Sequence, residues 1–183
     1  MHHYTTIAHF CLLLFPSASY EAPISAAGQI PTVKIGNAAN KWSADTSKVS
    51  QFLSAASSLS GHHLVEHATV ALSAEKDELI HKGVLDQQFL APSSPNRAVI
   101  VANNILVDQG TFQFVVDGLT ILSNHGASLS RKQVNSIISQ INEVRCGRVL
   151  PAIDTYFRAS SELLHNDLTL VATRPNNCFA ARE

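Results

Sequence analysis

Apolar residues recur every three or four positions along most of the chain after residue 45, which is the spacing of one face of an α-helix. The first such stripe consists of Val49, Phe52, Leu53, Ala56 and Leu59. It lies between Asp45 or Thr46, either of which can cap a helix N-terminus, and Gly61, a residue type that commonly follows a helix end. We therefore predict a first helix between these points.

A second stripe predicts a helix from about residue 62 to residue 82, with an inner face of Leu64, Ala68, Ala71, Leu72 and Leu79. Its last turns carry charged and titratable side chains, which we expect to face solvent: Glu75, Lys76, Asp77, Glu78, His81 and Lys82. Gly83 is the expected C-terminal cap, after which residues 84–90 can add a turn or two. Residues 91–96, with two prolines, are the clearest loop.

Residues 97–123 form the longest strongly apolar stretch beyond the N-terminus. Polar residues interrupt it, and each acidic side chain at bilayer depth would cost about 2.5–3.5 kcal/mol, so we expect a core segment and no membrane span. The spacing favours two helices that meet near Gly110, or one helix bent there. The many β-branched residues keep two strands open as the alternative.

The last long segment begins at Ser130, which forms a capping-box pattern with Gln133. An apolar stripe then runs from Val134 to Leu164, with Pro151 in its middle. Proline removes one helical hydrogen bond and crowds the carbonyl four residues earlier, here that of Gly147. The pattern predicts a kinked helix over residues 131–165, or two helices broken at Gly147.

Together these patterns predict an all-α, single-domain bundle of about five helices over residues 45–183, with a long kinked C-terminal helix. Residues 20–44 are rich in Ala, Pro and Gly and have weak periodicity, so we predict an extended N-terminal arm. A pro-region reaching to Gly36 is an alternative for part of this arm.

The first 19 residues have the form of a secretory signal peptide, which would be removed. The apolar run Ile7–Phe15 is too short to span a bilayer, and small residues at Ser17 and Ser19 suit cleavage after Ser19. No Lys or Arg precedes the run, and an uncleaved N-terminal tail is the alternative. The signal predicts a secreted, extracellular protein.

Cysteine usage agrees with export. Cys11 would leave with the signal, and Cys146 and Cys178 would remain to form one disulfide. The loop that this bond closes has about 31 residues, which corresponds to roughly 3–4 kcal/mol of stability. Two free thiols are the alternative.

Composition narrows the class of partner. The chain has 183 residues, of which 45% are hydrophobic and 15% charged, with a formal net charge of −1. This balance is typical of a globular domain and removes the electrostatic argument for nucleic acid as a partner.

One motif could carry chemistry. His63 and His67 lie in an H-x-x-E-H pattern, in which two histidines one helical turn apart bind zinc. The alternative is an ordinary solvated helix face. Nucleophile motifs are absent from the sequence, and we expect neither an enzyme nor a cofactor.

Two further groups of polar residues need an explanation. Asn103, Asn104, Gln109, Gln113 and Asp117 interrupt the apolar stretch and either line a pocket between helices or lie on its outer side. Arg145 and Arg148 flank Cys146 and are expected to make structural pairs. The serines of the first helix form a small polar face, or could carry O-linked sugar: Ser47, Ser50, Ser54, Ser57, Ser58 and Ser60.

Short stretches spread over nearly the whole mature chain resemble a group of small secreted proteins of filamentous fungi that are treated as effector or elicitor candidates. They are Lys41–Trp42, Asp45–Thr46, Glu75–Leu79, Val84–Asp86, Gln109–Phe112, Val116–Leu119, Ile141–Asn142, Arg145–Cys146, Val149–Asp154, Tyr156–Phe157, Arg174–Pro175 and Cys178. The resemblance implies secretion, a helical fold, one disulfide, no enzymatic activity and self-association as a homodimer. A weaker resemblance is to fungal helical cell-wall and hydrophobic-surface-binding proteins, whose apolar repeat with paired glycines is not evident here.

We therefore expect a secreted, non-enzymatic interaction protein that acts at a host or cell-wall interface, on a partner that the sequence does not name. The alternative is a binding module for a lipid or a hydrophobic surface. That alternative predicts an apolar cavity or patch around residues 97–123.

Overall fold

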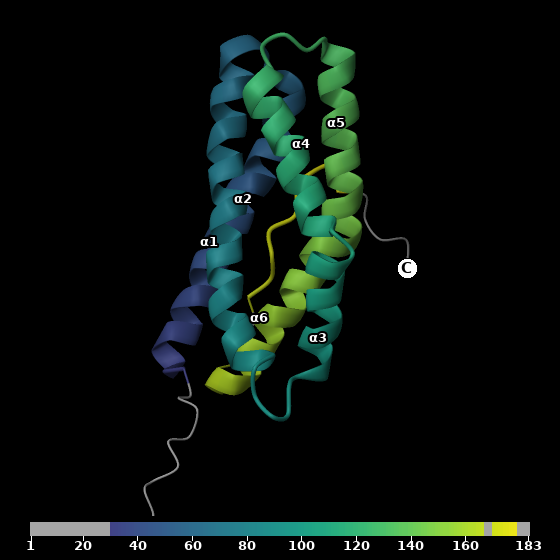
Figure 1. The fold of residues 1–183 in the computed structure, drawn as a ribbon. Coiled ribbons are helices and arrows are strands. Elements are labelled where there is room, and N and C mark those ends of the chain that lie inside the picture. The colour runs from purple at the N-terminus through teal and green to yellow at the C-terminus, as the bar shows by residue number, and fades with distance from the viewer. Residues whose placement is uncertain (1–29, 167–169, 179–183) are drawn as a thin grey trace, which may run out of the picture.

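A computed structural model of the chain describes residues 30–166 and 170–178 (Figure 1). The predicted signal peptide, residues 1–19, and the first ten residues of the predicted arm lie outside the described residues.

Four long helical stretches pack side by side as a bundle (Figure 1). They consist of α1 (Thr32–Ala55) with the short 3₁₀ turn η1 (Ala56–Ser58); α2 (Gly61–Phe89); α3 (Arg97–Asn103), the π-helical turn η2 (Asn104–Asp108) and α4 (Thr111–His125); and α5 (Arg131–Val144), the π-helical turn η3 (Arg145–Val149) and α6 (Leu150–Leu164). The described residues contain no strand. The predicted all-α bundle is confirmed, with four long helical stretches in place of about five.

Helix α1 begins thirteen residues earlier than predicted, so residues 32–44 are helical and not part of an extended arm. Ile35, Ala38, Ala39 and Trp42 are buried along this added part. Two of these four residues are alanines, which makes the periodicity weak in the sequence. Burial of the Trp42 and Ile35 side chains stabilises these turns, because tertiary packing outweighs the preference for a cap at Asp45 or Thr46.

Helix α2 continues through Gly83 to Phe89, so Gly83 is not a cap. A glycine inside a helix costs about 1 kcal/mol relative to alanine. Leu85 and Phe89, both buried beyond it, offset this cost. The predicted solvated end of this helix is wrong for Glu75, Glu78 and Lys82, which are buried, whereas Lys76 and Asp77 are exposed as predicted.

The central stretch is helical, and the strand alternative is wrong. The bend lies at Gly110, whose φ of 66° is in the left-handed region that favours glycine. Before it, Gln109 donates its backbone N–H to the carbonyl of Asn104, which is the five-residue spacing of a π-turn. Asn96 caps the start of α3 through the backbone N–H groups of Ala98 and Val99.

The last long segment is one kinked helical stretch, as the first of the two sequence alternatives predicted. Ser130 and Gln133 form the expected capping box. The kink is the π-turn η3, where the Leu150 N–H donates to the Arg145 carbonyl. This wider turn places Pro151 at the start of α6, a position where its missing N–H is tolerated.

The C-terminal residues 170–178, which we call the strap, run back along the bundle between helices (Figure 1). Ser47 and Ser50 of α1 hydrogen-bond to Thr173, and Ser54 accepts the backbone N–H of Asn176. The predicted Cys146–Cys178 disulfide, with 5.7 Å between its Cα atoms, closes the end of the strap on η3. Three of the serines of α1 therefore serve to hold the strap.

Asp154 of α6 holds the strap from the opposite side. It accepts the Ala172 backbone N–H at 2.8 Å and forms an ion pair with Arg174. The strap thus fills the space between α1 and α6 with hydrogen bonds to both helices.

Aromatic rings and one glycine define the closest packing in the core. Trp42 lies with its ring centroid 5.2 Å from that of Tyr156 and 5.8 Å from that of Phe157. Gly118 allows α4 to approach α5, because a Cβ at this position would lie 2.7 Å from the Ile141 side chain.

Candidate functional site: a buried charge network and an exposed apolar face

The histidines of the zinc-like motif do not form a metal centre. His63 and His67 are exposed on the outer side of α2. In the part of the chain that the structure describes, no three His, Cys, Asp or Glu side chains form a group that could hold a metal ion.

The polar residues of the central stretch do not converge on one pocket. Asn104 donates to Asp108 and accepts from Gln109, and Gln113 donates to Asp117, all at exposed positions. Asn103 alone reaches the interior, where it accepts a hydrogen bond from Lys82. The predicted pocket lining is therefore wrong for these residues as a set, and the alternative of an outer side describes most of them.

The interior instead contains an ion network that joins α1, α2 and η3. The side chains of Glu75, Glu78 and Arg145 are 0% exposed. Arg145 Nη1 lies 2.7 Å from Glu75 Oε2, and Arg145 Nη2 lies 3.0 Å from Glu78 Oε1. Trp42 donates its indole Nε1–H to Glu78 Oε2 at 2.8 Å. The expected structural pairing of Arg145 is thus confirmed, with partners about seventy positions earlier in the chain.

If both carboxyl groups were ionised, the buried network would hold two negative charges and only one positive charge. Burial raises the pKa of Glu75 well above its usual range; Arg145 opposes this effect and Glu78 adds to it. Burial likewise raises the pKa of Glu78, against Arg145 and Trp42. Burial alone would lower the pKa of Arg145, but the two glutamates reverse the direction. The network therefore raises the pKa of both carboxyl groups and keeps the arginine charged.

The geometry has room for a proton on Glu75. Glu75 Oε1 is buried without a hydrogen-bond partner among the described residues. A protonated Glu75 would have a donor, and the neighbouring Glu78 carboxyl is an acceptor close enough to influence its pKa. The pair then carries one net negative charge against Arg145.

A second polar cluster lies farther along α2 and joins it to α3 and α6. Lys82 Nζ contacts Asp86 Oδ2 at 2.6 Å and Asn103 Oδ1 at 2.5 Å. Tyr156 donates its hydroxyl to Asp86 Oδ1 at 2.6 Å. Burial, followed by the hydrogen bond to Asp86, raises the pKa of the Tyr156 phenol. This cluster holds three helices in register.

The ion network is closed to solvent. Glu75, Glu78 and Arg145 have no exposed surface through which a substrate could reach them. Their directional bonds instead fix how α1, α2 and η3 fit together, next to the disulfide at Cys146. Arg148, the second arginine beside that cysteine, donates to Gln109 on the surface.

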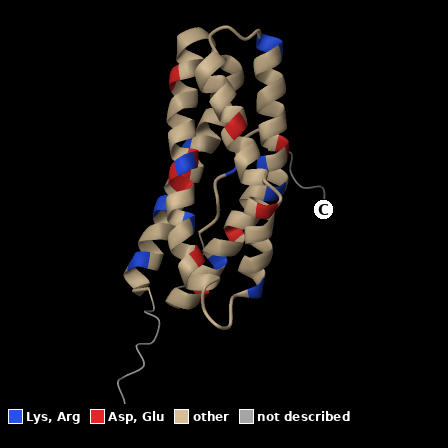
Figure 2. Cartoon of the chain, in the orientation of Figure 1, with Lys and Arg blue, Asp and Glu red and all other residues tan. Residues whose placement is uncertain are grey.

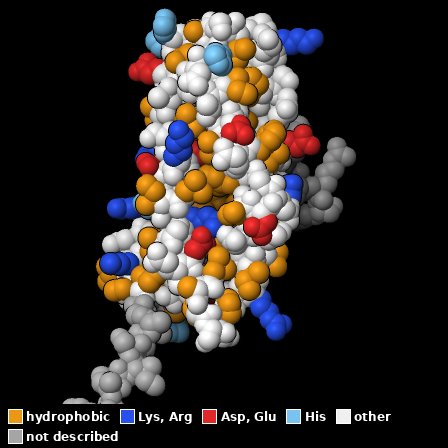
Figure 3. All heavy atoms as spheres, viewed as in Figure 1, with side chains coloured by type: hydrophobic (Ala, Val, Ile, Leu, Met, Phe, Trp, Pro, Cys, Tyr) orange, Lys and Arg blue, Asp and Glu red, His pale blue; other side chains and the backbone are white. Residues whose placement is uncertain are grey.

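The outer side of residues 97–125 shows the opposite pattern, with apolar side chains in water. We call the following residues the apolar face: Ile100, Val101, Val107, Phe114 and Ile121. Val101 is 61% exposed and Val107 is 51% exposed. In Figure 3 hydrophobic side chains occur in small groups along the visible side of the bundle, and Figure 2 shows both signs of charge interspersed along it.

By length and composition alone, the same segment could cross a membrane. This differs from the expectation that its polar residues make it a core segment and no membrane span. Arg97–His125 has 29 residues and a mean hydropathy of 1.3 in its most apolar window, 39% of which is buried in the bundle. Core helices of soluble proteins pass the same test. Here the high hydropathy comes from two sources, a buried side and the apolar face.

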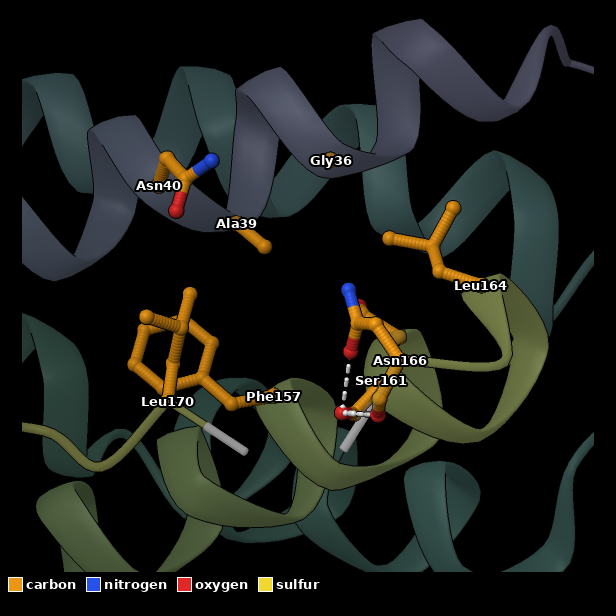
Figure 4. Close-up of a pocket in the computed structure, with 9 residues that line it drawn as sticks. Gly36, Ala39, Asn40, Phe157, Ser161, Leu164, Asn166 and Leu170 are labelled. Carbon is orange, nitrogen blue, oxygen red and sulfur yellow. Dashed lines mark hydrogen bonds between the residues drawn. The ribbon is translucent and has the colours of Figure 1, made fainter. Parts of the chain in front are cut away.

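Two of the clefts on the surface lie beside α6. One, of about 370 Å³, lies between α3 and α6 and is lined by Ala98, Val101, Ala102, Ile105, Pro151, Ala152, Thr155 and Arg158. The other, of about 200 Å³, lies between α1 and α6, with Ala39 facing Phe157 and Leu164 across it (Figure 4). In this second cleft Ser161 is already bonded to Asn166.

Comparison of the chain with protein-family models, with curated proteins and with solved structures gives no match. The functional argument therefore rests on the chain's own residues.

Sequence reasoning missed both the ion network and the α3–α6 cleft. One signal for the first was present: Glu75, Glu78 and Lys82 share the three- and four-residue spacing of Ala68 and Ala71, the buried face of α2. The cleft left no such signal, because its two walls come from segments about fifty residues apart.

Proposed function

We propose that this is a secreted, non-enzymatic interaction protein that acts at a host or cell-wall interface. The observation that carries the proposal is the distribution of side chains. Glu75, Glu78 and Arg145 are paired inside the bundle, whereas apolar side chains of residues 97–125 face solvent. Apolar surface that a fold leaves exposed is a common mark of an interaction site.

The disulfide supports the extracellular part of the proposal. Cys146 and Cys178 are joined, and such bonds persist mainly in oxidising compartments. The bond and the hydrogen bonds of the strap tie the C-terminal segment to the bundle, which suits a protein that must survive outside the cell.

Secretion is tested by fusing residues 1–19 to a reporter in a secreting host. Export of the reporter, with cleavage near Ser19, is the expected result. Reporter that stays inside the cell would contradict the proposal. The purified protein, expressed from residue 20, should bind insoluble wall material or evoke a response in a neighbouring organism without hydrolysing polysaccharide, ester or peptide substrates.

A second candidate, a binding module for a hydrophobic surface or lipid, is favoured by the apolar face itself. It predicts adsorption of the protein to polystyrene beads from dilute solution. The double variant V107S/F114S should lose most of this adsorption. The matched control is V70S/I80S, which alters two apolar residues of α2 that are more exposed than Val107 and Phe114, and it should adsorb as the wild type does. Equal losses in both variants would mean that adsorption is unspecific.

A further inference from the structure

The cleft between α3 and α6 has an apolar floor made of small side chains. Ala102 and Ala152 are buried at its base, and Ala98, Ile105 and Pro151 complete the apolar walls. Alanines on facing helices leave room that larger side chains would fill, which accounts for a cleft of about 370 Å³. Thr155 donates its hydroxyl to the Pro151 carbonyl, so this polar wall atom is already bonded.

Charge is confined to one end of the cleft. Arg158 is the charged residue of the lining, it is exposed, and among the described residues it has no hydrogen bond or ion pair. Helices α3 and α6 run in opposite directions (Figure 1), so Arg158 lies toward the end of the cleft where α3 begins. Arg97 is the first residue of α3, next to Ala98 in the wall. Arg97 and Arg158 therefore lie toward the same end along their helices, and of the two only Arg158 is part of the lining.

No charged residue is part of the lining at the opposite end. There Ile105 of η2 and Pro151 of α6 form the walls. From Ala98 to Ile105 the helical rise is about 10 Å, the scale of a medium-length alkyl chain and too short for a stable protein interface. A cleft with a cationic end and an apolar length is complementary to a molecule with an anionic head and an aliphatic tail.

We propose that the α3–α6 cleft binds a free single-chain aliphatic carboxylate. The tail lies against Ala102, Ala152 and Ile105, and the carboxylate accepts charge-assisted hydrogen bonds from Arg158, with Arg97 nearby. This inference rests on the second candidate function above and narrows it to one chemical class of ligand.

The test is a titration of the disulfide-bonded protein, expressed from residue 20, with decanoate, decanol and decylammonium, followed by calorimetry. Decanoate should bind more tightly than decanol, and decylammonium should bind least. R158Q should weaken decanoate binding about tenfold or more, since a hydrogen bond to a charged group is lost, and should leave decanol binding unchanged. K132Q, which alters an exposed lysine at the start of α5, is the matched control and should change neither.

A second measurement places the ligand. In V101W, the new indole at the cleft should be quenched by a decanoate brominated on its tail, whereas the buried Trp42 of the wild type should not. A98L should reduce binding of decanoate and decanol together by filling the cleft. Circular dichroism melting of each variant excludes misfolding as the cause.

Three results would overturn the inference. The first is equal decanoate affinity in R158Q and the wild type, and the second is binding of decylammonium as tight as that of decanoate. The third is binding of anionic vesicles that R158Q does not alter and that free decanoate does not displace. The last result would assign the surface to membranes. If the wild-type protein does not adsorb to the beads, the second candidate function is contradicted. If it adsorbs to the beads but does not bind decanoate, this inference alone is contradicted.

Discussion

Two regions of the molecule place side chains where their residue types are least favoured. They are the interior of the α1–α2–η3 junction and the outer side of residues 97–125. The interior holds Glu75, Glu78 and Arg145 away from water, and the outer side holds Val101 and Val107 in it. Both arrangements are unfavourable taken alone, because buried charges lose hydration and exposed apolar groups order water. They are tolerated for different reasons.

In the interior, the charges have partners at hydrogen-bond distance, and these bonds have direction. Apolar contacts would stabilise the junction as well, but would specify the fit of the three elements less sharply. On the outer side no partner within the described residues covers the apolar face. The comparison teaches that the interior network determines shape, whereas the apolar face is free to contact another molecule.

The largest predicted effect comes from breaking the network on one side. R145M removes the cation and leaves two buried carboxyl groups, so we expect a loss of about 3–5 kcal/mol in the free energy of unfolding, measured in urea. The matched control is E75Q/E78Q/R145M, which removes all three charges and should recover most of this loss. A loss below about 1 kcal/mol in R145M would show that the network contributes little to the fold.

The next effect concerns the disulfide that lies beside Arg145. C146S/C178S should lower the free energy of unfolding by roughly 3–4 kcal/mol, because the unfolded chain gains the freedom of the opened loop. The strap, held mainly by hydrogen bonds to α1 and α6, should then become a site of limited proteolysis ahead of the helices. Proteolytic cleavage within α4 at an earlier time than cleavage of the strap would contradict this order.

A smaller effect tests the protonation of Glu75. Its pKa is raised in the folded protein, so the folded state binds more protons than the unfolded state above the ordinary glutamate pKa of about 4.3. Stability from this group is therefore full at low pH and falls as pH rises toward the folded pKa. Each unit between the two pKa values corresponds to about 1 kcal/mol.

E75Q replaces the proton-binding carboxyl with an amide that keeps a donor. We expect the melting temperature of E75Q to depend less on pH between 5 and 8, and to exceed that of the wild type at pH 8. E162Q, at an exposed position of α6, is the control and should keep the wild-type pH profile. A wild-type protein that is more stable at pH 8 than at pH 5 would argue against a protonated Glu75.

The smallest effect on stability belongs to the apolar face. V107S/F114S should change the free energy of unfolding by about 0.5 kcal/mol or less, since these side chains are already largely in water. Combined with a loss of adsorption, this result would separate the function of the face from the stability of the fold. A large destabilisation would show that the face is part of the core.

Local patterns were sufficient for several parts of the fold. The Ser130–Gln133 capping box, the bend at Gly110 and the helical stripe around Pro151 are all signals within a few residues of the feature they produce. The Cys146–Cys178 bond followed from the count of cysteines left after the signal. These predictions succeed because the forces involved, backbone sterics and capping, act over one or two turns.

Other parts could not be predicted from one segment at a time. On α2, Glu75 and Glu78 resemble a solvated helix end until Arg145, some seventy residues later, supplies the cation that makes their burial tolerable. Ile80 resembles a core residue and is 64% exposed. The start of α1 was missed because its alanines give little signal without Trp42 and the helix that Trp42 packs against.

The sequence by itself therefore determined the helical class, the places where the helices bend and the covalent tie. Only the tertiary structure showed that the inner face of α2 includes charged side chains, that burial raises the pKa of Glu75 and Glu78, and which small side chains open the α3–α6 cleft. The physical reason is that burial and charge pairing are properties of surfaces that meet, and those surfaces come from residues far apart along the chain.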